Sequence, residues 1–268
     1  MIKRFIAVMI IAVGSLFLSL GSVWAQDKSA SEGILSDLGF TISGDLNFSS
    51  IYMWRGIMLD GDAVVQPGIY LTSVNSKLGK LKFGFWASQP MEKQDNLNSS
   101  EIDYIAEYSY SFPVLDFILG HTYYDFPDGL PLDGAAKAFS REAYVAFAFP
   151  KLFLSPSVYY YYDYGRKDDG GGEGSYTVLN ASYSQPFTLS NHNMSLDISG
   201  HIGSNNKLYY RGKGGDFGTT LGVTMPLTKN LTCKPNISYS LPWGNISDKG
   251  NGNQQARVYG GAYLSYIF

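Results

Sequence analysis

Nucleophilic catalysis of the triad type needs a serine or cysteine within reach of a histidine that a third polar side chain orients. The sequence has three histidines, and His201 is the one with suitable neighbours, because Ser199 precedes it by two residues and Ser204 and Asn205 follow it. The alternation around His201 places it on the polar face of a strand, and the sequence shows no spacing typical of a serine hydrolase. We therefore expect no catalytic residue.

The sequence offers no convincing candidate for a metal-binding or cofactor-binding site either. Cys233 is the only cysteine, so neither a disulfide nor a thiolate cluster is available within the chain. Asp60, Asp62 and Glu92 carry carboxylates, but their spacing matches no calcium-binding loop. The sequence predicts no metal site and no cofactor.

The composition separates this chain from several classes of protein. It is 45% hydrophobic, 15% aromatic and only 16% charged, with 30 glycines and a formal net charge of −3. A soluble domain carries about 25% charged residues. The slightly acidic balance argues against a nucleic-acid partner, and the aromatic content argues against disorder.

The first 25 residues form a separate segment. Lys3 and Arg4 precede an apolar stretch over residues 5–20, and small residues lead to Ala25, as in a secretory signal peptide. The alternative is an uncleaved membrane anchor. We interpret residues 26–39 as a periplasmic N-terminal tail or a short plug, and residues 40–268 as the folded domain. No later stretch has 18 apolar residues, which leaves a soluble exported β protein or an outer-membrane barrel.

Apolar and polar residues alternate along most of residues 40–268. In residues 40–52 the even positions are mainly apolar and the odd positions polar, and residues 101–112, 139–149 and 194–202 repeat the pattern. Twelve such segments start near residues 40, 64, 80, 101, 114, 139, 152, 175, 192, 215, 231 and 256. They predict an all-β fold, a transmembrane antiparallel up-and-down β-barrel of about 12 strands.

The connections alternate between short turns, four of which contain a proline, and long polar loops, as in outer-membrane barrels. The chain stops at Phe268 on an apolar strand face, and a terminal aromatic residue there resembles the signal that barrel-assembly machinery reads. Pro67, Pro156 and Pro235 fall inside proposed strands, where we expect β-bulges.

Several short motifs also resemble a known family. They are Tyr-Met-Trp-Arg-Gly-Ile at 52–57, Val-Val-Gln-Pro-Gly at 64–68, Gly-Phe-Trp-Ala-Ser at 84–88, Glu-Ile-Asp-Tyr at 101–104 and the tyrosine run at 159–163. Together they resemble the TorF-type porin family, whose domain is also classed among conserved bacterial proteins of unknown function. The resemblance implies an outer-membrane barrel with porin-like activity. Pro67 stands where the family pattern has glycine.

The polar face of each strand is expected to line the lumen. The residues predicted to do so are Arg55, Tyr70, Lys80, Lys82, Trp86, Glu101, Asp103, Glu107, Glu142, Tyr144, Tyr159, Tyr161, Asp197, His201, Arg257, Tyr259 and Tyr263, with Asp45, Asn47 and Ser199 beside them. Lys80 and Lys82 are expected opposite Glu101, Asp103 and Glu107, which would set up a field across the lumen.

Other readings of these residues remain open. Arg55 either pairs with the acidic loop at 60–62, folds inward as a constriction, or caps a loop. The inward aromatic residues suit stacking on sugars or nucleobases, whereas Tyr104, Tyr108, Tyr110, Tyr160, Tyr162 and Tyr164 fit an outward aromatic girdle.

The sequence thus predicts a porin-like channel for passive diffusion of small hydrophilic solutes, in the outer membrane of a Gram-negative bacterium. Its expected partners are outer-membrane lipid and lipopolysaccharide, the barrel-assembly machinery at Phe268 and a small polar solute. The alternatives are a narrow or plugged barrel with a structural or surface-interaction role, and a lipid-modifying enzyme, which the missing H-x-S spacing disfavours.

Overall fold

The computed structural model describes residues 39–73, 77–92, 100–127 and 138–268. The predicted signal peptide at 1–25 lies outside the described residues, as does the predicted tail except for Gly39. Within the described part of the chain, no helix is long and apolar enough to cross a membrane.

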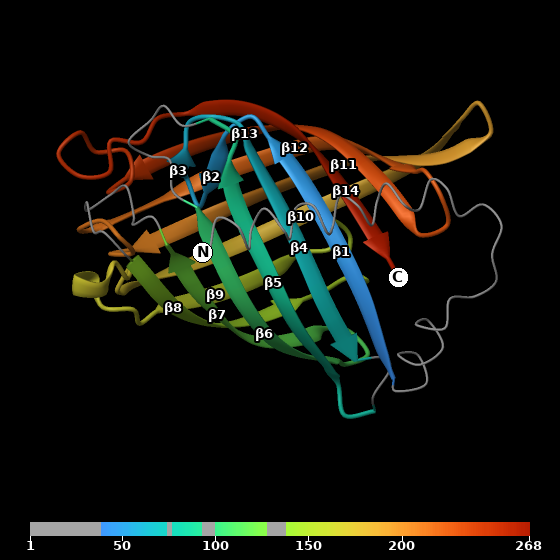
Figure 1. Cartoon of the computed structure of the whole chain (residues 1–268), viewed down its shortest axis with the longest axis horizontal. Coiled ribbons are helices and arrows are strands. Elements are labelled where there is room, and N and C mark those ends of the chain that lie inside the picture. Colours follow the sequence, from blue (N-terminus) through green and yellow to red (C-terminus); the bar gives the residue numbers. More distant parts are fainter. Residues whose placement is uncertain (1–38, 74–76, 93–99, 128–137) are drawn as a thin grey trace.

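Twelve strands form one closed antiparallel barrel (Figure 1). They are β1 (Phe40–Ser49), β4 (Val64–Ser73), β5 (Lys80–Pro90), β6 (Glu101–Ser111), β7 (Asp116–Phe126), β8 (Ala138–Ala148), β9 (Ser157–Asp163), β10 (Gly174–Leu189), β11 (His192–Asn206), β12 (Lys213–Pro226), β13 (Leu231–Gly244) and β14 (Arg257–Ile267). A short 3-10 helix, η2 (Lys167–Asp169), lies between β9 and β10. Each strand pairs with its neighbours, and β14 pairs with β1 from Ser43↔Ile267 to Ser49↔Gly261, which closes the barrel.

The predicted strand starts agree with the structure within two residues, except at Leu152. There β9 begins only at Ser157 because the chain turns first, with Leu154 and Ser155 in the left-handed region at φ 63° and 38°. Phe153 is 79% exposed in this turn, so its apolar character does not mark a strand. The Leu154 carbonyl accepts a hydrogen bond from the Ser182 amide, which attaches the turn to β10.

The bulges expected at the three prolines are absent. Pro67 pairs with Leu46, and the β4–β5 register is the same on both sides of it. Pro235 likewise pairs with Ala262, while β12 and β13 keep one register past it. Each proline lacks a donor on one side only, so the ladder is interrupted there without a shift. Pro156 lies in the turn before β9.

The outer and inner faces of the barrel wall differ in polarity, as the alternation predicts. Phe83, Phe85, Tyr160 and Tyr162 are among the large apolar and aromatic side chains exposed on the outside, at 44–51%. Buried polar side chains instead gather inside, where they bond to one another across strands. Because lipid offers no hydrogen bonds, a closed ladder with an apolar outer face is the arrangement that a membrane permits.

Glycines on the inner face allow tyrosine rings to lie flat against the wall. A methyl group at Gly120 would overlap the ring of Tyr144, and one at Gly203 would overlap the ring of Tyr176. Tyr176 uses this space to donate a 2.7 Å hydrogen bond to Asp216. Inner glycines therefore decide where the polar ends of these tyrosines lie.

We expect Gly203→Ala to destabilise the barrel by about 1–3 kcal/mol, because the added methyl group forces Tyr176 away from Asp216. Urea unfolding in detergent, followed by the heat-dependent gel shift of the barrel, measures the loss. Gly200→Ala is the matched control in the same strand, since the nearest atom to its Cβ would be the Gly218 carbonyl at 3.5 Å. Equal stability of the two variants would contradict the prediction.

Candidate functional site

Between β1 and β4, the chain forms a small hairpin inside the barrel, made of β2 (Tyr52–Trp54) and β3 (Ile57–Asp60). We call it the inner hairpin. Arg55 and Gly56 join its strands with φ angles of 50° and 77°, and a two-residue turn of this kind needs positive φ at both positions. Arg55 has a side chain, so its left-handed backbone costs about 1 kcal/mol or more.

The inner hairpin reaches the opposite wall of the lumen. A Cβ at Gly56 would lie 2.6 Å from Cβ of Asp216 in β12 and 3.5 Å from Cβ of Pro242 in β13. Its first strand contacts the other side, where the Tyr52 ring lies 5.8 Å from that of Trp86 in β5. The hairpin therefore crosses the lumen at the end that carries the long loops.

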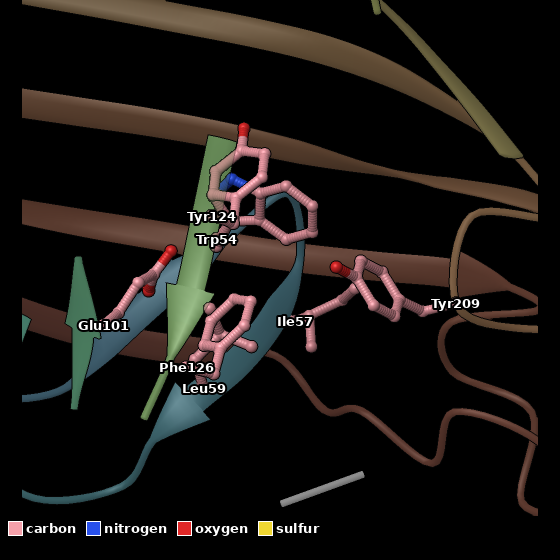
Figure 2. Close-up of a pocket in the computed structure, with 7 residues that line it drawn as sticks. All are labelled: Trp54, Ile57, Leu59, Glu101, Tyr124, Phe126 and Tyr209. Atoms are coloured by element: carbon pink, nitrogen blue, oxygen red, sulfur yellow. The ribbon is translucent and has the colours of Figure 1, made fainter. Parts of the chain in front are cut away.

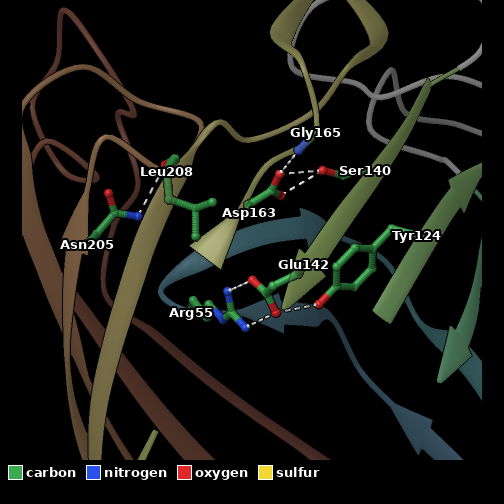
Figure 3. A network of polar contacts seen from close by, with 8 residues as sticks. All are labelled: Arg55, Tyr124, Ser140, Glu142, Asp163, Gly165, Asn205 and Leu208. Carbon is green, nitrogen blue, oxygen red and sulfur yellow. Dashed lines mark hydrogen bonds and ion pairs between the residues drawn. The ribbon is translucent and has the colours of Figure 1, made fainter. Parts of the chain in front are cut away.

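A buried ion pair fixes the tip of the inner hairpin (Figure 3). Arg55 donates two hydrogen bonds to Glu142 in β8, at 2.5 and 2.8 Å, and the side chains are 10% and 1% exposed. The Tyr124 hydroxyl donates a third, at 3.0 Å, to the same carboxylate. Burial alone would lower the pKa of Arg55, but the charge and hydrogen bonds of Glu142 raise it above its ordinary value. The guanidinium group stays charged.

Three aromatic rings surround the Arg55 guanidinium. Its central carbon lies 4.4 Å from the ring centroid of Trp54, 4.0 Å from that of Tyr161 and 4.8 Å from that of Tyr176. Aromatic faces attract cations at such distances, most strongly where water is excluded. We call Glu142, Tyr161, Tyr176 and Trp54 the cation cage.

Hydrogen bonds hold the loops at the same end of the barrel close to the inner hairpin. Asp163 accepts hydrogen bonds from Ser140 Oγ at 2.6 and 2.7 Å and from the Gly165 amide at 2.9 Å (Figure 3). Asn205 donates to the Leu208 carbonyl at 3.2 Å, and the Tyr209 amide donates to Gly172 at 3.0 Å. These bonds hold Tyr209 against Trp54, with ring centroids 5.8 Å apart.

Apolar contacts fill the space beside the inner hairpin. Ile57 is fully buried with Ile246 and Tyr210 in one cluster. Ile57 and Trp54 also line a cavity of about 10 Å³ whose other walls are Leu59, Glu101, Tyr124, Phe126 and Tyr209 (Figure 2). Such a volume holds about one water molecule, so this side of the hairpin is tightly packed. Burial, followed by the charges of Glu101 and Asp103, raises the pKa of Tyr52 well above its ordinary value.

The other half of the lumen is more open. A hollow of about 700 Å³ lies near the end with the short turns, lined by polar side chains of β10 to β13 and also by apolar ones, among them Leu152, Phe153, Leu154 and Ile198. Asp197 lies in its wall and accepts hydrogen bonds from Ser184 at 2.6 Å and Thr224 at 2.5 Å. Lys234 forms an ion pair with the same carboxylate at 3.2 Å. The barrel thus has a closed loop half and a hollow turn half.

The structure places every residue predicted to line the lumen on the inner side of the barrel. Arg55, Tyr161 and Glu142 meet in the cation cage. Pairs form between Lys82 and Glu107 at 3.0 Å, Tyr144 and Glu107 at 2.8 Å, Tyr263 and Asp45 at 2.8 Å, and His201 and Asp216 at 2.8 Å. Asn47, Tyr70, Lys80, Trp86, Glu101, Asp103, Tyr159, Asp197, Ser199, Arg257 and Tyr259 occupy inner positions elsewhere on the wall. Their role in a pore stays a prediction.

Two details of the expected arrangement differ. Lys82 pairs with Glu107 but not with Glu101 or Asp103, which lie farther along β6, opposite Ser88 and Trp86. Arg55 pairs with Glu142 and not with the acidic loop at 60–62, because the inner hairpin points that loop away from its tip. Among the described residues, no group of histidine, cysteine and carboxylate side chains is placed to hold a metal ion.

Sequence reasoning missed the inner hairpin and with it Tyr124, Tyr176 and Asp216. A signal was present, because Gly56 follows Arg55 between the apolar residues Trp54 and Ile57, as in a tight hairpin turn. Nothing local shows that such a hairpin folds into the lumen.

Comparison with known proteins gives a family and a fold. A family model described as "Bacterial protein of unknown function (Gcw_chp)" matches residues 35–234. No curated protein matches. The structure is similar to that of LpxR from Salmonella typhimurium, with 11% identity over 84% of this chain and 100% of that one and a TM-score of 0.52.

Other similar structures carry names of different kinds. A KdgM porin shares 11% identity over 84% of this chain and 99% of its own, with a TM-score of 0.49. The outer membrane phospholipase A from Escherichia coli shares 12% identity over 84% and 89%, with a TM-score of 0.46. At such low identity the likeness concerns the barrel fold alone.

We expect Arg55→Met and Glu142→Leu each to cost about 3–5 kcal/mol of unfolding free energy, because each leaves one buried charge without its partner. The double variant should cost clearly less than the sum, since both charges are gone. Urea unfolding of all four proteins in detergent measures the cycle.

Arg166→Met is the control for this cycle. The side chains of Arg166 and Asp168 are 77% and 88% exposed, and such a pair contributes about 1 kcal/mol at most. Additive losses in the Arg55 and Glu142 variants would show that the two side chains do not act together.

Proposed function

The chain belongs to the Gcw_chp family of bacterial proteins, and we propose that it is an outer-membrane channel for small hydrophilic solutes whose inner hairpin sets the constriction. The observation that carries the proposal is the hollow of about 700 Å³ in the turn half of a closed barrel with an apolar outer face. Asp197, Lys234 and several serine hydroxyls lie in its wall beside apolar side chains, and these polar groups can hydrogen-bond water and hydrophilic solutes.

The outer face supports the location in a lipid membrane. Aromatic side chains such as Tyr104, Tyr160, Tyr162 and Tyr164 are 41–51% exposed on it, as in the girdle of an outer-membrane barrel. Phe268 ends the chain beside β1, where its amide donates to the Ile42 carbonyl at 3.0 Å. We assign the protein to the outer membrane of a Gram-negative bacterium, with lipopolysaccharide outside and assembly machinery recognising Phe268.

A second function is favoured by the contacts of the inner hairpin. The tip of the hairpin is held by Glu142, and a cavity of only about 10 Å³ remains beside it. A barrel closed permanently at this level would serve a structural or surface-interaction role. The two functions differ in whether ions pass the intact protein.

Conductance across planar bilayers separates these functions. We expect the intact protein to give small single-channel currents, because the inner hairpin crosses the lumen. Replacing residues 52–60 by a short Gly-Ser linker should raise the conductance several-fold, since the contacts between the walls are removed. A silent intact protein with a conducting deletion variant would establish the closed barrel, and two silent proteins would overturn the channel.

Ion selectivity tests the charges of the wall. Lys82→Glu should shift the reversal potential in a salt gradient in the direction of higher cation selectivity. In the unmodified protein Lys82 Nζ lies 3.0 Å from Glu107 Oε1, so the substitution places a second carboxylate beside Glu107. Lys249→Glu is the matched control, since it makes the same charge change in an exposed loop outside the lumen. An unchanged reversal potential in Lys82→Glu would show that ions do not pass this wall.

A further inference from the structure

The cation cage is built mainly on barrel strands and not on the hairpin that fills it. Glu142 comes from β8, Tyr161 from β9 and Tyr176 from β10. Tyr124 of β7 holds the Glu142 carboxylate by a 3.0 Å hydrogen bond, and Asp216 of β12 holds the Tyr176 hydroxyl at 2.7 Å. The side chains of the wall are therefore oriented by the barrel itself.

The chemistry of the cage selects one kind of ligand. A carboxylate that is 1% exposed forms its base, and the tyrosine faces of β9 and β10 lie 4.0 and 4.8 Å from the guanidinium carbon. A carboxylate beside aromatic faces binds a compact organic cation that gives hydrogen bonds and tolerates loss of water. A guanidinium group fits best, because its planar fork matches the carboxylate and its face matches the rings.

The surrounding wall is rich in carboxylates. Glu101, Asp103, Asp163 and Asp216 are all buried at 8% exposure or less in the same half of the lumen. Two lysines of the wall are already engaged, since Lys82 pairs with Glu107 and Lys234 with Asp197. Carboxyl groups gathered in a narrow space offer acceptor oxygens to a ligand that donates several hydrogen bonds.

We infer that the cation cage is a binding site for organic cations that carry a guanidinium or primary ammonium group, and that Arg55 occupies it as a tethered competitor. The left-handed backbone of Arg55, at φ 50°, favours release of the hairpin tip once another cation takes its place. The role of the bound cation as a transported solute rests on the proposed channel function. Binding itself does not.

The test removes the tethered competitor and adds a free one. Arg55→Ala, purified in detergent, is titrated with methylguanidinium chloride, and the midpoint of thermal unfolding is compared with that in sodium chloride at equal ionic strength. We expect methylguanidinium to raise the midpoint by several degrees with half-saturation in about the millimolar range. Wild-type protein should not respond at these concentrations, because Arg55 fills the cage.

Two variants determine whether the response comes from the cage. Arg55→Ala combined with Glu142→Gln should lose it, since the carboxylate at its base is gone. Arg166→Ala, which removes an exposed arginine, should behave as wild type. A response of Arg55→Ala no larger than that to sodium, or one that survives Glu142→Gln, overturns the inference.

The titration is independent of ion conduction. Should Arg55→Ala fail to fold, the same titration is done with Arg55→Lys. Lysine keeps the positive charge but lacks the planar fork of arginine. Methylguanidinium should therefore displace it from the cage at a lower concentration than it needs to displace arginine. A barrel that binds methylguanidinium without conducting would refute the channel and leave the binding site in place. A conducting barrel whose Arg55 variants bind nothing would refute the binding site alone.

Discussion

The buried charge of Arg55 is the constraint that determines how the loop half of the lumen is packed. A buried guanidinium group is costly unless an anion and several acceptors or rings surround it. Glu142 supplies the anion, and Tyr161, Tyr176 and Trp54 supply the rings. Each of these partners is in turn fixed by a neighbour, such as Tyr124 on Glu142. The position of the inner hairpin therefore depends on four strands of the barrel, β7 to β10.

The width of a barrel explains why such an element is needed. Eight strands leave an interior that side chains fill, whereas sixteen leave a water-filled channel. Twelve strands lie between these limits. In the loop half the additional filling comes from the inner hairpin and from Tyr209, Tyr210 and Ile246 of two other loops. In the turn half no described element plays that role, and the hollow beside Asp197 results.

The same division bears on how a channel of this kind discriminates between solutes. The hollow of the turn half presents hydroxyl groups and the ion pair of Asp197 with Lys234, which suit hydrophilic molecules, beside the apolar residues 152–154. The loop half presents a carboxylate enclosed by rings, which suits a cation. Selectivity and closure would then depend on the same residues. The Arg55 guanidinium, which blocks the passage, is an organic cation like the solutes that the cation cage would bind.

The sequence by itself determined the twelve strands of the barrel and, along most of them, the face on which the side chains lie. Side chains along a strand point alternately to its two faces, so the alternation in residues 40–52 can be recognised without knowing which strands pair with it. The register past Pro67 and the inward course of residues 52–60 were decided by the tertiary structure alone. Arg55 and Glu142 are 87 positions apart, and they meet only because barrel closure brings β8 opposite a loop that follows β1. Local periodicity carries no information about such a contact.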